Sequence, residues 1–268
     1  MAAQDAKNHG SYFVPGLAKG LQVLEAVAAA EAALTTAEIA RASGLTRSAA
    51  FRLVYTLRHL RYLEEADAAG KTYRVGPRVL NLGFAWLDGQ EIAALAEPDL
   101  RQLCEATGVS AHLAVLEGTE IVYLVCVNTA RAAYVSNITV GSRRPAHASP
   151  LGWLLLGGLG GDAIAARYDE TPLEAATAHT PTSRAALIER ATASARAGYV
   201  VSRGFLAPGG VSIAAPVRER GGAMVAAIDI SGPESAFDAG PLETAYLPKV
   251  AEAAARISER LGSAHRAA

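Results

Sequence analysis

The chain has 268 residues, of which 51% are hydrophobic and 19% are charged, and its formal net charge is −1. This length suits a small domain followed by a larger one, and the composition excludes a disordered chain and a uniformly basic nucleic-acid coat. The most apolar run, 151–159, is too short and too rich in glycine to span a bilayer. We therefore expect a cytoplasmic protein without a membrane partner.

The cysteines and the distribution of charge exclude further classes of protein. Cys104 and Cys126 form no disulfide framework, and no cluster of cysteine and histidine has metal-ligand spacing, so we expect no metal and no cofactor. Residues 17–78 hold nine basic and six acidic residues, whereas 79–268 hold fifteen and nineteen. The basic excess therefore lies near the N-terminus.

The first elements have the spacing of a helix-turn-helix. Residues 1–10 have no apolar core region, and apolar residues later recur at helical spacing over 17–30. Thr35 and Glu38 form a capping box that begins a second helix. Gly44 supplies a tight turn, and Thr46 caps a third helix that runs to about Arg61.

The third helix has the composition of a DNA-recognition helix, because no carboxylate occurs over 46–61. Its predicted inward residues are Ala50, Leu53, Val54, Leu57 and Leu60. Arginine at the start of such a helix can bind guanine through two hydrogen bonds, and hydroxyls can reach bases or phosphates. The predicted base and phosphate contacts here are Thr36, Thr46, Arg47, Ser48, Ala49 and Arg52.

A hairpin, or wing, is predicted to follow the third helix. Two short strands, 62–65 and 72–75, flank a polar turn. Lys71, Tyr73 and Arg74 are expected to lie along the phosphate backbone. The alternative is an ordinary three-helix domain with a solvated basic face.

Antiparallel hairpins and flanking helices dominate the rest of the chain, which predicts an α+β domain. The predicted helices cover 77–88, a segment from Pro98 to Gly108, 150–156, 183–197 and 242–261. The predicted strands are 110–116 with 121–127, then 133–140, then 211–217 with 223–230.

The segment before the helix at 150–156 predicts an anion site. Ser149 is a good N-cap and Pro150 suits the first helical position, so unpaired backbone N–H groups there can bind a carboxylate. Nearby Arg143, Arg144 and His147 could support such a ligand, or they could be surface residues of a loop.

Taken together, these features resemble the IclR family of bacterial transcriptional regulators over nearly the whole chain. The matching stretches are 15–24 (PGLAKGLQVL), 38–41 (EIAR), 44–48 (GLTRS), 51–53 (FRL) and 73–76 (YRVG). The resemblance implies an N-terminal winged helix-turn-helix and a C-terminal GAF-like antiparallel-sheet sensor. It divides the chain into a disordered tail (1–14), a DNA-binding domain (15–76), a linker helix (77–94), an effector-binding domain (95–262) and a second tail (263–268).

The resemblance also implies what the two domains bind. Partners are a duplex DNA operator, a small organic acid and further copies of the chain, as a homodimer or homotetramer. The implied effector-binding residues are Ser136, Pro150, Leu151, Ser202, Gly210, Ser212, Asp229 and Ser231. Whether the protein activates or represses is not implied.

Two departures from the family pattern bear on the effector. No acidic residue occurs over 190–218, where relatives usually have one, and Asp229 replaces a small polar residue. A buried carboxylate needs a donor or a cation. We therefore expect the effector to offer a hydroxyl, amide or amine to Asp229 and its carboxyl end to the helix start at Pro150, as an aromatic hydroxy acid or an amide-like derivative does. Two alternatives stay open. Asp229 could point outward at a strand end, and, separately, the effector could be a short-chain acid of central metabolism.

Two other classes of function are less well supported. The stretch 210–214 (GVSIA) lacks the last glycine of a nucleophile elbow and falls in a predicted hairpin, so a nucleophilic Ser212 is not expected. The glycine run 157–161 lacks the Lys and Ser/Thr of a phosphate-binding loop. We therefore do not expect an enzyme. A non-catalytic interaction module that uses the winged helix without reading DNA stays open.

Overall fold

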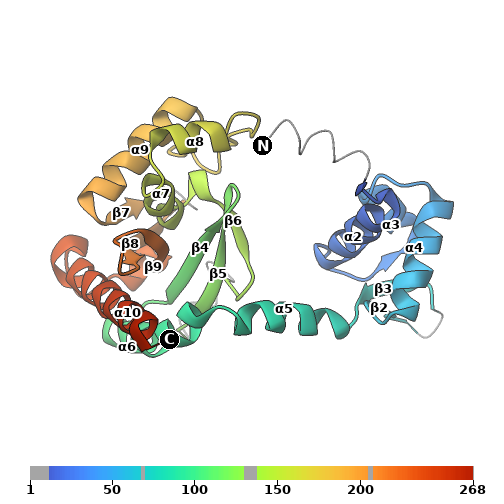
Figure 1. Ribbon diagram of the computed structural model, residues 1–268, viewed down its shortest axis with the longest axis horizontal. Helices are drawn as coiled ribbons and strands as arrows, with labels where there is room; N and C mark the ends of the chain where they lie inside the picture. The colour runs from blue at the N-terminus through green and yellow to red at the C-terminus, as the bar shows by residue number, and fades with distance from the viewer. Residues whose placement is uncertain (1–11, 68–69, 130–137, 205–207, 268) are drawn as a thin grey trace. The chain divides into compact units, whose positions relative to one another are not determined.

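The computed structural model describes residues 12–67, 70–129, 138–204 and 208–267. The chain divides into two compact units, Met1–Asp88 and Gly89–Ala268 (Figure 1). Each unit has its own buried apolar core, and they are described separately below.

The first unit is a winged helix-turn-helix. Its helices are α2 (Pro15–Ala28), α3 (Thr36–Ala42), α4 (Arg47–His59) and α5 (Arg78–Asp88). Its antiparallel strands are β1 (Leu34–Thr35), β2 (Leu63–Glu65) and β3 (Thr72–Val75), in the order β1-β3-β2. Side chains of α2, α3, α4 and β2 meet in the core, namely Val23, Val27, Ile39, Val54 and Leu63.

Local capping explains where these helices begin. The hydroxyl of Thr35 accepts from the backbone N–H of Glu38 at 3.3 Å, and the Glu38 carboxylate accepts from the Thr35 backbone N–H at 2.8 Å, which confirms the predicted capping box. Thr46 caps α4 by accepting from Ala49 N at 3.3 Å. One inward prediction was wrong: Leu60 is 42% exposed, because α4 ends at His59 and Leu60 lies beyond its last turn.

The second unit is a six-stranded antiparallel sheet with helices on both faces (Figure 1). The strands are β4 (Ala111–Glu117), β5 (Glu120–Val127), β6 (Arg143–Pro145), β7 (Val200–Arg203), β8 (Gly210–Arg218) and β9 (Met224–Pro233), in the order β6-β5-β4-β9-β8-β7. Helices α6 (Glu91–Thr107) and α10 (Leu247–Ala267) pack on one face. Helix α7 (Pro150–Gly157) packs on the other, and α8 (Gly161–Arg167) and α9 (Arg184–Ala197) pack on α7.

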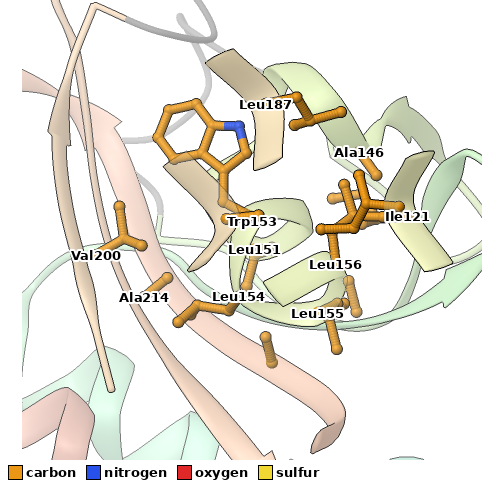
Figure 2. Packing of buried hydrophobic residues seen from close by; sticks show 14 of the residues in the cluster. Ile121, Ala146, Leu151, Trp153, Leu154, Leu155, Leu156, Leu187, Val200 and Ala214 are labelled. Atoms are coloured by element: carbon orange, nitrogen blue, oxygen red, sulfur yellow. The ribbon is translucent and has the colours of Figure 1, made fainter. Parts of the chain in front are cut away.

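Helix α7 is the centre of the larger core. Every residue from Pro150 to Leu156 is buried, as expected of a helix that is apolar all round. Figure 2 shows Trp153 inside this cluster, with Leu187 from α9 and Ile121 from β5 around it. The indole N–H of Trp153 donates to the His147 carbonyl at 2.7 Å, so its one polar atom is satisfied.

Two predictions of local structure in this unit were wrong. Pro98 does not begin a helix; it lies exposed inside α6, which starts at Glu91 because Ile92 and Ala96 pack into the core. Residues 138–140, the described end of the strand expected at 133–140, are not in a strand. The glycine run 157–161 ends α7 at Gly157, and Gly160 then turns the chain into α8.

Candidate functional site

The exposed face of α4 is the candidate DNA interface. Arg47, Ser48 and Arg52 are exposed there, and Ala49 is half-buried. Within the described residues neither Arg47 nor Arg52 forms a salt bridge, so both guanidinium groups are available to a ligand. Arg58, further along the helix, is instead paired with Glu65 of the wing.

Sequence reasoning missed one side chain on this face. Phe51 is 59% exposed beside Arg52. The sequence could have shown this, because Phe51 is an aromatic residue that does not belong to the predicted inward face of α4. Apolar side chains on recognition helices contact thymine methyl groups.

The wing residues differ in how available they are. Lys71 is exposed near the tip, and the Asp67 carboxylate shapes the turn by accepting from the backbone N–H groups of Lys71 at 3.2 Å and Thr72 at 2.8 Å. Tyr73 packs against the core and its hydroxyl donates to Gly70 O at 3.3 Å. Arg74 is exposed but pairs with Glu64 at 2.7 Å. Lys71 is therefore the least constrained cation of the described wing.

In the second unit, polar residues form a row across the sheet. Directly paired residues point to the same face, and Ser202, Ser212 and Ser231 are paired across β7, β8 and β9. One step along, Asp229 is paired with Ala214 on β8 and with His112 on β4. Because Ala214 belongs to the α7 core, this row lies on the face that α7 covers.

A buried His–Asp pair occupies the centre of the row. His112 Nδ1 lies 2.9 Å from Asp229 Oδ1, and the Ser212 hydroxyl donates to Asp229 Oδ2 at 2.9 Å. The side chains of His112 and Asp229 are each 1% exposed. The chain itself therefore supplies the partners that Asp229 was expected to find in a ligand.

This arrangement decides between the two interpretations of Asp229 and weighs against a nucleophile. Asp229 lies inside β9 and is buried, so the alternative of an outward side chain at a strand end was wrong. Ser212 bonds to a carboxylate rather than to a histidine base, which is not how a nucleophilic serine is activated.

Tyr123 of β5 borders the pair and was missed by the sequence analysis. Its ring meets that of His112 edge to face, with centroids 5.7 Å apart. Burial, and then the Asp229 carboxylate, raise the pKa of Tyr123 far above its ordinary value. The same two causes raise the pKa of the Cys126 thiol, which is paired with His112 in the sheet, to about 12.

The start of α7 is the other part of this site. Ser149 is the N-cap residue, yet its buried hydroxyl makes no cap hydrogen bond. Pro150 and Leu151 follow it and are buried, and Gly210 begins β8 in the row of Ser212. Ser136 lies outside the described residues.

The two arginines before α7 lie on the surface, and only the charge of Arg144 acts on the site, where it opposes the rise in the pKa of Tyr123. Arg143 is exposed on β6 and pairs with Glu117 and Glu120, and Arg144 is exposed beside it. Both arginines are therefore surface residues, as the alternative interpretation held. His147 is buried, and its Nε2 lies 2.9 Å from Glu174 O.

Within the described residues, no three histidine, cysteine, aspartate or glutamate side chains cluster as metal ligands would, and no helix is long and apolar enough to cross a membrane.

Comparison with known families identifies both units. The family model for the IclR helix-turn-helix domain matches residues 16–67, and the model for the bacterial transcriptional regulator IclR C-terminal domain matches residues 84–259. The chain belongs to the IclR family. It is a DNA-binding transcriptional regulator with a C-terminal effector-binding domain.

Several IclR relatives are similar over most of their length. The Pca regulon regulatory protein of Pseudomonas putida is 30% identical over 252 residues, which is 93% of this chain and 84% of that protein. The p-hydroxybenzoate hydroxylase transcriptional activator of Acinetobacter baylyi is 29% identical over 222 residues, 81% of this chain and 80% of that one. The solved structure of an IclR homolog from Microbacterium hydrocarbonoxydans, complexed with 4-hydroxybenzoate, has a TM-score of 0.77 and 28% identity, covering 94% of this chain and 100% of that chain.

Proposed function

We propose that this IclR regulator binds an operator as a homodimer and responds to an aromatic hydroxy acid, or an amide-like derivative, from a catabolic pathway. The observation that carries the DNA-binding part is the exposed face of α4, which bears free guanidinium groups and no carboxylate. The effector class is supported by the buried polar row and by the relatives whose names concern hydroxybenzoate.

On the operator, the N-terminal turn of α4 enters the major groove. Arg47 and Arg52 contact base edges and phosphates, with Ser48 and Ala49 closest to the bases. Thr36 and Thr46 begin α3 and α4, where hydroxyls and backbone N–H groups bind phosphate. Lys71, and to a lesser degree Tyr73 and Arg74, lie along the phosphate backbone.

Homodimer formation is proposed because the first unit leaves a large apolar surface uncovered. Exposed apolar side chains of α2 and α5 are Leu17, Leu21, Leu80, Leu82, Phe84 and Trp86. Contiguous exposed patches of this kind mark protein interfaces. Two chains paired through this unit present two recognition helices to half-sites about 34 Å apart. Assembly of dimers into a tetramer through the sensor domains is a further part of this proposal.

In the sensor, the effector lies between the start of α7 and the polar row of the sheet. Its carboxyl end faces Ser149, Pro150 and Leu151, where the first N–H groups of α7 have no intrahelical partner. Its other end faces the serines of the row, Ser202, Ser212 and Ser231, beside Gly210 and Asp229. Ser136 is assigned to the same site from the family pattern alone.

The DNA-binding part is tested with the full chain and a duplex from the region upstream of its own gene. We expect binding whose affinity falls steeply with salt, because phosphate contacts release counterions. Arg52→Ala should lose about fivefold to a hundredfold in specific affinity, since a good base contact is worth about 1–3 kcal/mol. Lys71→Ala should weaken specific and nonspecific binding alike and reduce the salt slope by about 1.

Arg101→Ala is the matched control, because Arg101 is an exposed arginine of the sensor unit that pairs with Glu97. It should bind the operator as the wild type does. Failure of the wild-type protein to retain any duplex at low salt would rule out operator recognition and favour an interaction module.

A further inference from the structure

Two hydroxyl groups in the sensor core are buried without a hydrogen-bond partner. Within the described residues these are Tyr123 Oη and Ser149 Oγ, each on a residue that is 0% exposed. Buried polar groups are almost always paired, and leaving one unpaired costs about 1–3 kcal/mol. Such a cost is expected where a ligand provides the missing partner.

The neighbouring polar groups of the core show that unpaired hydroxyls are the exception here. The Tyr168 hydroxyl donates to Thr119 O at 3.1 Å, and the Tyr246 hydroxyl accepts from Ala239 N at 2.8 Å. Trp153 donates to His147 O at 2.7 Å. Tyr123 belongs to the same apolar cluster as Trp153 and Tyr168, and its aromatic ring is packed like theirs. Tyr123 differs from them only in that its hydroxyl has no hydrogen-bond partner among the described residues.

Asp229 does not fill the role that Tyr123 leaves open. Its Oδ1 is occupied by His112 and its Oδ2 by Ser212, both at 2.9 Å. The Asp229 carboxylate therefore acts on a ligand through its charge and by fixing His112 and Ser212, whereas the Tyr123 hydroxyl is a donor with nothing to donate to.

The chemistry of the missing partner follows from the surroundings of Tyr123. The raised pKa of Tyr123 keeps its hydroxyl protonated, so it can donate to a ligand oxygen. Two side-chain charges of opposite sign act on that hydroxyl: the buried Asp229 carboxylate and, more weakly, the exposed Arg144 guanidinium, whose charge is screened by solvent. The Asp229 carboxylate is the stronger of the two and disfavours a second anion beside the hydroxyl. The ligand group at this point is therefore an uncharged acceptor.

We propose that the Tyr123 hydroxyl recognises an uncharged oxygen of the effector, a phenol or an amide oxygen, and that Ser149 at the start of α7 receives the effector's carboxylate. This assignment rests on the proposed function and deepens it. Helix α7 packs on β4 and β5 as well as on β8 and β9, so Tyr123 and Ser149 border the same layer between helix and sheet. Tyr123 then sets the preference for a hydroxylated ring over a bare one.

The experiment measures Kd by calorimetry on the full chain with three probes: 4-hydroxybenzoate, benzoate and terephthalate. A neutral hydrogen bond contributes about 1 kcal/mol, so the wild type should bind 4-hydroxybenzoate roughly fivefold to tenfold more tightly than benzoate. Terephthalate, which places a second carboxylate beside Asp229, should bind most weakly. In Tyr123→Phe the ratio of the first two affinities should fall to about one.

The melting temperature of the ligand-free protein gives a second readout. Tyr123→Phe removes an unpaired hydroxyl and should melt at or above the wild-type temperature. Tyr168→Phe is the matched control: it removes a hydroxyl that has a partner, so it should melt lower while keeping the wild-type ratio of affinities. Ser149→Ala should weaken the binding of 4-hydroxybenzoate and of benzoate by the same factor, because both probes carry the carboxylate.

The outcomes separate this assignment from the function it rests on. A Tyr123→Phe protein that keeps the wild-type preference, or that melts lower as Tyr168→Phe does, overturns the role of Tyr123 alone. A wild-type protein that binds none of the three probes overturns the aromatic effector and this assignment with it, and leaves operator binding to be judged by its own test.

Discussion

The two candidate sites carry charge in opposite surroundings. On α4, Arg47 and Arg52 are exposed and depend only on a stable helix beneath them. In the sensor sheet, His112 and Asp229 are each 1% exposed and depend on one another. A surface site of the first kind can be altered without cost to the fold, whereas a change in a buried polar pair also lowers the stability of the fold.

The largest effect that tests this contrast is expected for Asp229→Ala. Removing one partner of a buried pair leaves the other without compensation and typically costs about 3–5 kcal/mol. Here Asp229→Ala would leave both His112 and the Ser212 hydroxyl without their partner. Denaturant unfolding followed by circular dichroism should show the sensor unit losing stability by about that amount.

Arg52→Ala is the counterpart in the DNA-binding unit. It should leave the free energy of unfolding within about 0.5 kcal/mol of wild type, because no partner is lost. If Asp229→Ala and Arg52→Ala lowered the free energy of unfolding by the same amount, the contrast between the two sites would be wrong.

A second, smaller effect concerns the packing of α7. A Cβ at Gly157 would lie 2.1 Å from the Ala191 carbonyl oxygen of α9, so Gly157→Ala should force the two helices apart and cost about 1–3 kcal/mol. At the adjacent Gly158 the nearest atom to a Cβ would be Met224 Cβ at 3.1 Å, a tight contact with a side chain rather than an overlap with backbone. Thermal unfolding should therefore separate the two variants, and a Gly158→Ala protein as unstable as Gly157→Ala would refute the close approach as the cause.

Much of the DNA-binding unit could be predicted because its signals are local. The capping box at Thr35, the cap at Thr46 and the wing strands each lie within a few residues of one another. What escaped prediction there was β1, a strand of only two residues that pairs with β3. Short strands carry too little alternation to be recognised.

The sensor site could be predicted only in part, because its contacts join distant segments. The sequence showed that a buried Asp229 needs a partner, and we expected the ligand to provide it. The partner is instead His112, which lies 117 residues away in the chain. Pairing of β4 with β9 brings the two together, and no local pattern specifies that neighbour. The unpaired hydroxyl of Tyr123 is equally invisible in sequence, since only the packed core shows which buried groups lack partners.

The smallest effect tests how far the DNA-binding unit depends on its backbone. Arg61, just beyond α4, has φ of 62°, a left-handed conformation that side chains disfavour, and Tyr62 N donates back to Leu57 O at 2.8 Å to close the helix end. Arg61→Gly should relieve this strain and raise the free energy of unfolding by about 0.5–1 kcal/mol, partly offset by the flexibility of glycine.

The matched control is Gly44→Ala, at φ of 65° with open space around its Cβ position. It introduces the strain that Arg61→Gly removes and should lower stability by about 1 kcal/mol. Neither change touches a buried contact. If denaturant unfolding shows that the free energy of unfolding rises in Arg61→Gly and falls in Gly44→Ala, both effects come from the backbone alone. A loss of stability in Arg61→Gly would mean instead that its side chain contributes more than the strain costs, and that even the exposed edge of the recognition helix is not independent of the fold.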